Sequence, residues 1–319
     1  MGENFYIGDN GRANKVRGVY IGIEDKAKKI IKGYIGVGGV AAKFYGEKHE
    51  LYVDFVLDNN DWETISSVAK AGQAANYWSV GDCKRVHIKG EFGGFEMDED
   101  CYCYIIEINR REFGSQKDTI GRNIHFQFGK TAADGGKTIA FVDSTYGVSG
   151  AGRGFCMNLE NSMRCGWRNS HMRKVVCAEF YESLPEDLRS VVSVCKKYGA
   201  APPESGSYSY THCYELVEDR IFLLSEGEVF GSNSYSGEMI RSGSANINGG
   251  MRQYPYYNGS SQRTRYKHSS PSSGARWWLR SVSATAEEYF CVVSVYGYSG
   301  HTNAYNGNGF APAFMVGDL

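Results

Sequence analysis

The sequence has little proline, no excess of charge of either sign and no long apolar run. Only 6 of its 319 residues are Pro, and the formal net charge is -1. A nearly neutral chain has no general field that would attract nucleic acid or a membrane surface, so neither is expected as a partner. No stretch has the length and hydrophobicity of a membrane-spanning helix.

The N-terminus also lacks the features of a secretion signal. Glu3 stands where a signal peptide carries basic residues, and no apolar stretch follows it. We therefore expect synthesis in a cytoplasm without a signal peptide.

Metal-binding patterns are missing as well. The nine cysteines include no Cys-x-x-Cys pair, and an odd, scattered set does not form a disulfide framework. The acidic run Glu96–Asp100 lacks the ligand spacing of a calcium loop, and we predict a solvated loop there. No metal and no cofactor are therefore expected, and the cysteines are predicted to be buried thiols.

Catalytic motifs are equally scarce. The sequence has no phosphate-binding Gly-rich motif, no His-Glu-x-x-His and no Gly-x-Ser-x-Gly. Ser-x-x-Lys occurs as Ser67–Lys70 and Ser193–Lys196 without partner motifs. A Cys165–His171 nucleophile pair would need an exposed thiol and a third, orienting group. We predict no catalytic residues and no enzymatic activity.

What the sequence does contain is a short repeat at its start. Tyr-Ile-Gly recurs at a spacing of fourteen residues, beginning at Tyr6, Tyr20 and Tyr34. Each copy predicts a strand, a turn and a second strand. Residues 1–46 are therefore predicted to be a β-hairpin repeat module, and residues 47–319 a separate domain.

A unit this short cannot bury an apolar face of its own. It must stack on its neighbours, on other subunits or on a partner. We therefore expect residues 1–46 to serve attachment or oligomerisation, with a homotrimer as one possibility. Its lysines are spread evenly along the repeat, which favours a solvated face over a nucleic-acid site.

The larger domain combines strands that are grouped early and late with helices between them, which predicts an α+β fold. Asn60 or Asp61 is the expected cap of the first helix. The expected helices are Asp61–Gly72, Asn169–Tyr181 and Pro185–Tyr198. The expected strands are Lys84–Lys89, Cys101–Asn109, Asn123–Gln127, Lys137–Asp143, Arg220–Ser225, Trp277–Ser281, Phe290–Val295 and Phe314–Val316.

The segment from Tyr289 to Asn308 differs in kind from the rest. It contains no Lys, Arg, Glu or Asp and is rich in Tyr, Ser, Gly and Asn. Tyr supplies rigid contact area, and small polar residues supply adaptable hydrogen bonds, as in antibody combining sites. The alternative is a Gly-rich connector. We predict a ligand-binding surface made of Tyr289, Ser294, Tyr296, Tyr298, Ser299, His301, Thr302, Asn303, Tyr305, Asn306 and Asn308.

Two further expectations concern the geometry of this surface. Six of its side chains should be exposed on one contiguous face: Tyr296, Tyr298, His301, Asn303, Tyr305 and Asn306. A buried frame should hold them: Trp278, Leu279, Phe290, Pro312 and Phe314. Of the pair Trp277–Trp278, one ring should lie in the core and the other should be half exposed.

The C-terminal motifs carry a family resemblance. Trp277–Ser281, Phe290, Gly297 and the run Gly309–Phe314 resemble the end of a C-type-lectin-like domain of phages and gut bacteria. Tyr77–Asp82, Gly166–Trp167 and Phe222–Ser225 resemble earlier parts of that domain. The family typically ends in Gly-Val-Arg-Pro-Ala-Phe, from which this sequence departs at Phe310 and Ala311. The resemblance implies a C-type-lectin-like fold for about Trp62 to Val316.

Many members of that family are variable proteins of diversity-generating retroelements. In such proteins adenine mutagenesis scatters certain codons, and Lys, Glu, Gln, Trp and Met do not arise from it. Those residues are absent from Tyr289 to Asn308, whereas Glu287 and Glu288 lie just outside. The N-terminal repeat resembles a module of phage structural proteins. The resemblance therefore implies a virion-associated, hypervariable receptor-binding protein, of phage or prophage origin, with a protein or glycan ligand on a host cell surface.

Two other functions stay open. A carbohydrate-binding module would use surface Trp277, Trp278 and neighbouring tyrosines. An enzyme of the formylglycine-forming branch of the fold would need two cooperating cysteines near the surface, and no convincing pair is found. Calcium-dependent sugar binding is not implied, because neither Glu-Pro-Asn nor Trp-Asn-Asp occurs.

Overall fold

The computed structural model describes the strands within residues 1–46 and most of the chain beyond them. The ranges beyond residue 46 are 53–110, 121–130, 139–141, 155–200, 214–236, 252–259, 261–268, 270 and 272–318. The chain divides into two compact units, Met1–Val53 and Asp54–Leu319.

In the first unit each sequence repeat forms one antiparallel hairpin, as predicted. The hairpins pair β1 (Tyr6–Asp9) with β2 (Arg12–Lys15), β3 (Val19–Ile23) with β4 (Lys26–Ile30), and β5 (Lys32–Val37) with β6 (Val40–Gly46). The repeat tyrosine stands opposite a lysine in all three, as Tyr6 does opposite Lys15. The fourteen-residue period is therefore the length of one hairpin with its connection. Side chains of this unit lie outside the described residues, so its role in assembly stays a prediction.

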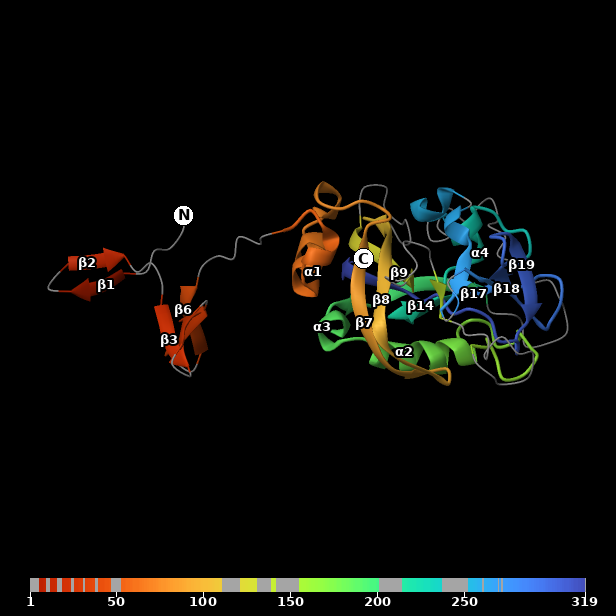
Figure 1. Ribbon diagram of the computed structural model, residues 1–319, viewed down its shortest axis with the longest axis horizontal. Coiled ribbons are helices and arrows are strands. Elements are labelled where there is room, and N and C mark those ends of the chain that lie inside the picture. The colour runs from red at the N-terminus through yellow and green to blue at the C-terminus, as the bar shows by residue number, and fades with distance from the viewer. Residues whose placement is uncertain are drawn as a thin grey trace. The chain divides into compact units, whose positions relative to one another are not determined.

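The second unit is built on a six-stranded antiparallel sheet (Figure 1). Its strands follow the order β11-β20-β9-β8-β7, and β14 also pairs with β20. The strands are β7 (Cys83–Phe92), β8 (Phe95–Ile108), β9 (Arg122–Lys130), β11 (Val192–Ser193), β14 (Ile221–Phe222) and β20 (Ala313–Asp318). Helices accompany this sheet, which confirms the predicted α+β class.

Helix α1 (Trp62–Lys70) packs on the sheet and begins where the sequence predicted. The Asp61 side chain accepts a hydrogen bond from the Thr64 amide at 2.7 Å, which caps the helix. The Trp62 ring lies edge-on to Phe126 of β9 and Phe314 of β20, with centroids 5.4 and 5.9 Å away. The other helical segments are η1 (Leu57–Asn59), η2 (Ala74–Asn76), the π-helical η4 (Met172–Val176), α2 (Cys177–Glu182), α3 (Glu186–Arg189), α4 (Glu226–Phe230), η5 (Pro255–Asn258) and η6 (Ser261–Arg263).

Three smaller sheets complete the unit. The C-terminal one contains β17 (Trp277–Val282), β18 (Tyr289–Val293) and β19 (Ser299–Asn303), all antiparallel. The second contains β10 (Ile139–Ala140), β15 (Arg265–Lys267) and β16 (Gly274–Ala275), with β10 and β15 parallel. The third pairs β12 (Cys195–Ala200) with β13 (Tyr214–Asp219).

Gly309 marks a close contact between the C-terminal segment and this framework. Its amide donates to the Arg276 carbonyl at 2.6 Å, and its carbonyl accepts from the Trp278 amide at 3.0 Å. A Cβ at this position would lie 2.4 Å from Cβ of Ala140. Only glycine fits there, which explains the first residue of the motif Gly309–Phe314.

Two sequence predictions are wrong, and both concern segments that form strands. The helix predicted over Pro185–Tyr198 is limited to α3. Val192 pairs with Val316 of β20, and β12 pairs with β13, so contacts distant in sequence override the helical spacing of the apolar residues. The predicted helix over Asn169–Tyr181 corresponds to η4 and α2.

The acidic run Glu96–Asp100 is not a loop but part of β8. Lys89 of β7 donates to Asp98 at 2.7 Å, and His87 lies between Asp98 and Asp100 at 2.9 and 3.0 Å. Hydrogen bonds that the carboxylates of Asp100 and Asp98 accept from the imidazole raise the pKa of the exposed His87. Opposite charges across two strands thus stabilise an exposed sheet face.

None of the helices in the described ranges is both long and apolar enough to cross a bilayer. Of the strand predicted at Lys137–Asp143, Ile139–Phe141 is described and contains β10; its other residues lie outside the described part.

Candidate functional site

The predicted ligand-binding segment forms a hairpin of β18 and β19 with a tightly held turn. The Ser294 amide donates to the Tyr298 carbonyl at 2.7 Å, and the Gly297 amide donates to the Ser294 carbonyl at 3.0 Å. The Ser294 hydroxyl accepts from the amide of Tyr298 at 3.0 Å. Gly297 has a φ of 81°, which favours glycine. Main-chain groups, one serine and one glycine thus define the turn.

This turn carries the two most exposed large apolar side chains among those described. Tyr296 is 77% exposed and Tyr298 is 70% exposed, whereas Val293, just before the turn, is fully buried. The hydrogen bonds of the turn use only the main-chain atoms of Tyr296 and Tyr298. In the described part of the chain, their two rings therefore point outward and take no part in the hydrogen bonds of the turn. The exposure expected for these two residues is confirmed.

The other predicted residues do not all share one face. Tyr289 stands opposite Asn303, and Cys291 stands opposite His301, so these four side chains lie on the same face of the hairpin. Thr302, one residue away, points to the opposite face. The predicted residues therefore surround the strand β19 rather than cover one plane, because successive strand residues alternate in direction.

His301 is the centre of an aromatic row. Its ring centroid lies 4.7 Å from that of Tyr289 and 4.7 Å from that of Tyr235. Its Nδ1 is hydrogen-bonded to the hydroxyls of Ser283 at 2.9 Å and Thr285 at 3.1 Å. Burial lowers the pKa of His301, and the Glu226 carboxylate opposes that shift. The row is therefore a half-buried, neutral surface of three rings from three chain segments.

Glu226, the first residue of α4, fastens these segments together. Its carboxylate is fully buried and accepts from the amides of Ser234, Tyr235 and Ser236, the last at 2.7 Å. It also accepts from the hydroxyl of Ser299 in β19. One carboxylate thus fixes the segment that carries Tyr235 to the edge of the hairpin. Sequence reasoning missed this residue, because no motif links it to its partners.

The remaining predicted residues are less accessible than expected. Ser294, Ser299, Thr302, Asn303, Tyr305 and Asn306 are half-buried. The Asn306 amide group donates to the Thr302 hydroxyl at 2.9 Å, which ties two predicted ligand residues to each other. Asn308 is only 8% exposed, and its amide donates to the Phe155 carbonyl at 3.1 Å. Asn308 therefore belongs to the support of the hairpin.

A loop of residues 155–164 braces the hairpin. The amides of Met157 and Asn158 both donate to the Ala304 carbonyl, at 2.9 and 3.0 Å. The Arg164 guanidinium donates from Nε and Nη2 to the Glu287 carboxylate, at 2.9 and 2.8 Å. The Met163 amide donates to the Glu287 carbonyl at 2.7 Å. Glu287 is thus a structural residue, which explains a charged side chain next to an uncharged segment.

The buried frame expected beneath the hairpin is confirmed. Trp278, Leu279, Phe290, Pro312 and Phe314 are all buried. The prediction that one of the two tryptophan rings is half exposed is wrong, however.

Both rings of the pair Trp277–Trp278 are fully buried. Their indole N–H groups donate to the Arg263 carbonyl at 2.9 Å and the Phe155 carbonyl at 2.7 Å. Neither ring is therefore available to stack on a sugar, because the short strand β17 is covered on both faces.

A buried ion cluster anchors β17 to its surroundings. Arg280 of β17 forms an ion pair with Glu228 of α4 and donates to the Leu223 carbonyl at 2.7 Å. Lys197 of β12 forms a second ion pair with Glu228, with 3.2 Å between its Nζ and the carboxylate Oε1. Burial raises the pKa of Glu228, but Arg280, Lys197 and Arg110 outweigh it and bring that pKa to about 2. The cluster is therefore fully charged at neutral pH and holds β17, β12 and α4 together.

Cys165 and His171 do not form a nucleophile pair. The Cys165 thiol accepts from the Asn158 side-chain amide at 3.0 Å, and its burial raises its pKa. Among the described residues no hydrogen bond joins this thiol to the His171 imidazole. A protonated, partly buried thiol is a poor nucleophile.

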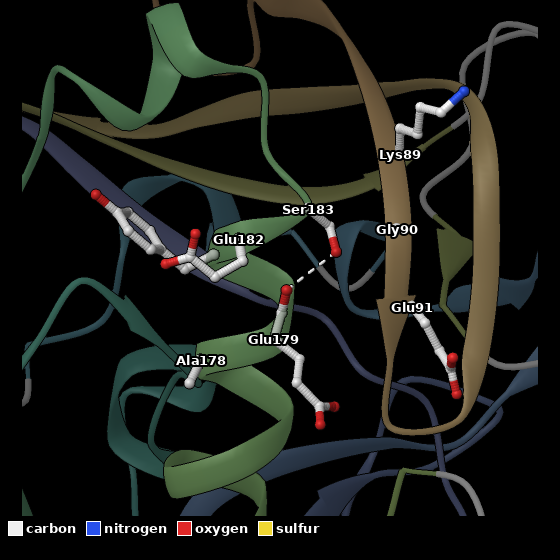
Figure 2. A pocket seen from close by; sticks show the side chains of 8 residues that line it. Lys89, Gly90, Glu91, Ala178, Glu179, Glu182 and Ser183 are labelled. Atoms are coloured by element: carbon white, nitrogen blue, oxygen red, sulfur yellow. Dashed lines mark hydrogen bonds between the residues drawn. The ribbon is translucent and has the colours of Figure 1, made fainter.

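The described part of the chain contains one hollow of note, away from the hairpin. It has a volume of about 490 Å³ and lies between β7 and α2 (Figure 2). Glu91, Glu179 and Glu182 line it together with Lys89 and Gly90. No group of three His, Cys, Asp or Glu side chains suited to a metal ion occurs in the described ranges.

Comparison with known proteins gives one match. Residues 156–317 match a family model described as a domain of unknown function, DUF6273. The matched region contains the brace, the aromatic row, the hairpin and the central strand β20. No curated protein and no solved structure matches the chain.

Proposed function

The chain belongs to the DUF6273 family of domains of unknown function, and for this member we propose ligand binding, with the β18–β19 hairpin and its aromatic row as the recognition surface. The observation that carries the proposal is the turn with Tyr296 and Tyr298. Two aromatic rings, 77% and 70% exposed, project from a turn whose own hydrogen bonds fix its shape. Ring area presented on an ordered turn binds with a smaller loss of conformational entropy than a mobile loop.

The charges around the hairpin support the same function. From Tyr289 to Asn308 the chain carries no formal charge, and the nearby Glu287 is paired with Arg164. A partner therefore makes contact without removing ions from water at the centre of the surface, which is the costliest part of polar binding. The ligand should be uncharged where it meets the hairpin.

A finer proposal follows from the family resemblance of the C-terminal motifs. The hairpin would be a hypervariable surface, diversified by a retroelement, in a receptor-binding protein of phage or prophage origin. The way in which the hairpin is held supports this proposal. Main-chain hydrogen bonds, Gly297 and Glu226 fix its shape, whereas no described residue is hydrogen-bonded to the side chain of Tyr296 or Tyr298. Such positions accept many residues without unfolding. A virion-associated protein of this kind would bind a protein or glycan on a host cell.

A binding experiment on the full chain tests the general proposal. The labelled protein would be applied to a glycan array and to a display library of random 12-residue peptides. We expect at least one of the two probes to bind, and the double variant Tyr296→Ala, Tyr298→Ala to lose about tenfold or more in affinity. Phe55→Ala is the matched control, because Phe55 is 69% exposed but lies outside the hairpin.

The result also separates the alternatives. Binding that survives the double Tyr variant would place the recognition surface elsewhere and contradict the proposal. Glycan binding that needs Tyr296 and Tyr298 would make the protein a carbohydrate-binding module that works without its tryptophans. A near-copy of the C-terminal coding segment beside a reverse-transcriptase gene is the observation that the retroelement proposal requires.

A further inference from the structure

The outer edge of β19 presents main-chain groups that no described residue binds. β19 is the outermost strand of the β17-β18-β19 sheet (Figure 1). Which of its residues face outward follows from the hydrogen bonds at both ends of the hairpin. The Ser294 amide donates to the Tyr298 carbonyl at 2.7 Å, and the Ala304 amide donates to the Glu288 carbonyl at 2.7 Å. Alternation between these two pairs directs Gly300 and Thr302 toward β18.

Ser299, His301 and Asn303 therefore direct their amides and carbonyls away from the sheet. The Asn303 carbonyl accepts from the Asn306 amide at 3.0 Å. The His301 amide and carbonyl and the Asn303 amide have no hydrogen-bond partner within the described part of the chain. These groups form the alternating row of donors and acceptors that one side of an extended strand requires.

The edge of the six-stranded sheet, at β7, differs from the edge at β19. At the edge strand β7, the Arg85 amide donates to the Asp58 carboxylate at 2.8 Å and the Lys89 amide to the Ser183 carbonyl at 3.1 Å. Just past its end, the Gly93 amide donates to the Glu179 carboxylate at 2.8 Å. The protein thus covers one sheet edge with its own chain and also lines it with charges. Among the described residues β19 has no comparable cover: Glu226 binds the Ser299 hydroxyl at one end, and the Asn306 amide binds the Asn303 carbonyl at the other. Its sequence Ser-Gly-His-Thr-Asn has no charge and no proline, and its register with β18 has no bulge.

Sheet edges without charge, proline or bulge are the ones that accept another strand. We propose that β19 receives an extended polypeptide segment of the ligand as an added fourth strand, with His301 at the centre of the new pairing. This inference rests on the proposed ligand-binding function and specifies the ligand as a polypeptide. The segment should be uncharged over the paired residues, because Ser299–Asn303 itself carries no charge. A glycan lacks the regular main-chain donors and acceptors, at a two-residue spacing of roughly 7 Å, that match this row.

The test compares two substitutions at one position of the full chain. Proline removes the outward amide of His301 but leaves the β18 ladder intact, since proline is tolerated where an edge-strand amide faces solvent. His301→Ala removes the same imidazole and keeps the amide, so it is the matched control. Thr302→Pro is the folding control, because it removes an amide that points into the ladder. The probe is the set of 12-residue peptides selected from the random display library on the unmodified protein.

His301→Ala sets the affinity that remains without the imidazole, and we expect His301→Pro to weaken peptide affinity at least about tenfold relative to His301→Ala. Within the peptide, N-methylation should abolish binding at every second amide only. This peptide series needs no protein variant, so the proposal stays testable even if His301→Pro unfolds.

Three outcomes would overturn it. Peptides that depend on Tyr296 and Tyr298 but ignore His301→Pro and N-methylation would leave the proposed function standing without strand addition. A protein that selects glycans and no peptide would do the same. Self-association of the full chain that His301→Pro alone abolishes would assign the edge to a second copy.

Discussion

At the scale of single residues, the C-terminal sheet separates aromatic side chains that bind from those that support. Trp278 is fully buried and donates its indole N–H to the Phe155 carbonyl, so it belongs to the framework. Tyr296 and Tyr298 are mostly exposed, and only their main chains are engaged. Composition shows how many aromatic residues are present but not which of these two roles each one has.

This division predicts opposite effects on stability. The double variant Tyr296→Ala, Tyr298→Ala should change the free energy of unfolding by less than about 1 kcal/mol, because exposed side chains contribute little. Trp278→Ala should cost about 3–5 kcal/mol, because a large cavity remains and a buried hydrogen bond to the Phe155 carbonyl is lost. Urea unfolding followed by circular dichroism measures both. A double variant that unfolds much earlier than the unmodified protein would show that the two rings belong to the core.

A second residue-scale prediction concerns acid. The pKa of Glu228 falls from its usual 4.5 to about 2, because Arg280, Lys197 and Arg110 outweigh the opposing effect of burial. A carboxyl whose pKa is lower in the folded protein contributes stability above the unfolded value, and that contribution is lost as pH falls from about 4.5 toward 2.

We therefore expect stability to fall across that pH range, as followed by thermal unfolding at a series of pH values. Glu228→Gln should flatten this part of the profile and cost about 3–5 kcal/mol at neutral pH, since it leaves buried cations unpaired. Glu186→Gln, at an exposed position of α3, is the control. A variant that keeps the full acid dependence would assign it to other carboxyls.

At the scale of elements, the shape of the recognition surface depends on one carboxylate. Glu226 joins α4, the segment Ser234–Ser236 and β19, and through Tyr235 it sets the place of the row around His301. It contacts no exposed surface itself, so its effect on binding would be through position. Preorganisation of this kind is what a binding surface needs from its supporting residues.

Glu226→Gln should loosen this segment selectively. An amide has one acceptor oxygen where the carboxylate has two, so at least one buried donor loses its partner, at a cost of about 1–3 kcal/mol. Hydrogen exchange should become faster at the amides of Ser234, Tyr235 and Ser236, with little change in β18. Glu186→Gln, at the first residue of α3, should change neither. Unchanged exchange at Tyr235 would show that the carboxylate does not hold the segment.

The sequence allowed β18, the buried frame and the exposure of Tyr296 and Tyr298 to be predicted because their signals are local, whereas β19 was not predicted. Alternation and apolar content identify β18 and β20, and a shift to uncharged residues identifies the turn. Other features depend on partners far along the chain. Val192 and Cys195 continue the helical spacing that begins at Leu188, but they lie in strands because they pair with β20 and β13. Glu226 and Ser299 are likewise far apart in the sequence and come into contact only in the folded protein. Asn308 is buried because its main-chain amide binds the Phe155 carbonyl.

At the scale of the whole molecule, the chain contains two compact units with different construction. The hairpins of Met1–Val53 are formed by local contacts at a fixed repeat, whereas Asp54–Leu319 is an α+β unit whose main antiparallel sheet joins strands distant in sequence. A two-stranded hairpin is at best marginally stable alone, so the first unit requires further contacts. The predicted assembly role supplies them from other subunits.

We expect the full chain to self-associate, with a trimer as one possibility, and residues 47–319 to be monomeric. Sedimentation velocity at micromolar concentration measures both, and thermal unfolding of the shorter chain checks that it is folded. If the full chain is also monomeric, docking on a partner remains as the role of the repeat. An oligomer that persists without residues 1–46 would place the interface in the larger unit.

The position of β20 has a consequence for how the protein is made. Ala313–Asp318 pairs with β9, β11 and β14 and follows all three along the chain, so this interior strand is synthesised after each of its partners. Until it leaves the ribosome, β9 has an open edge and Trp62 lacks one of its aromatic neighbours, Phe314. The sheet is therefore completed only after translation has passed these residues. A ribosome that stalls anywhere from Tyr289 to Asn308 leaves an incomplete, aggregation-prone sheet. A frameshift or a truncation ahead of β20 would therefore give a chain that does not fold, rather than a folded protein with an altered surface.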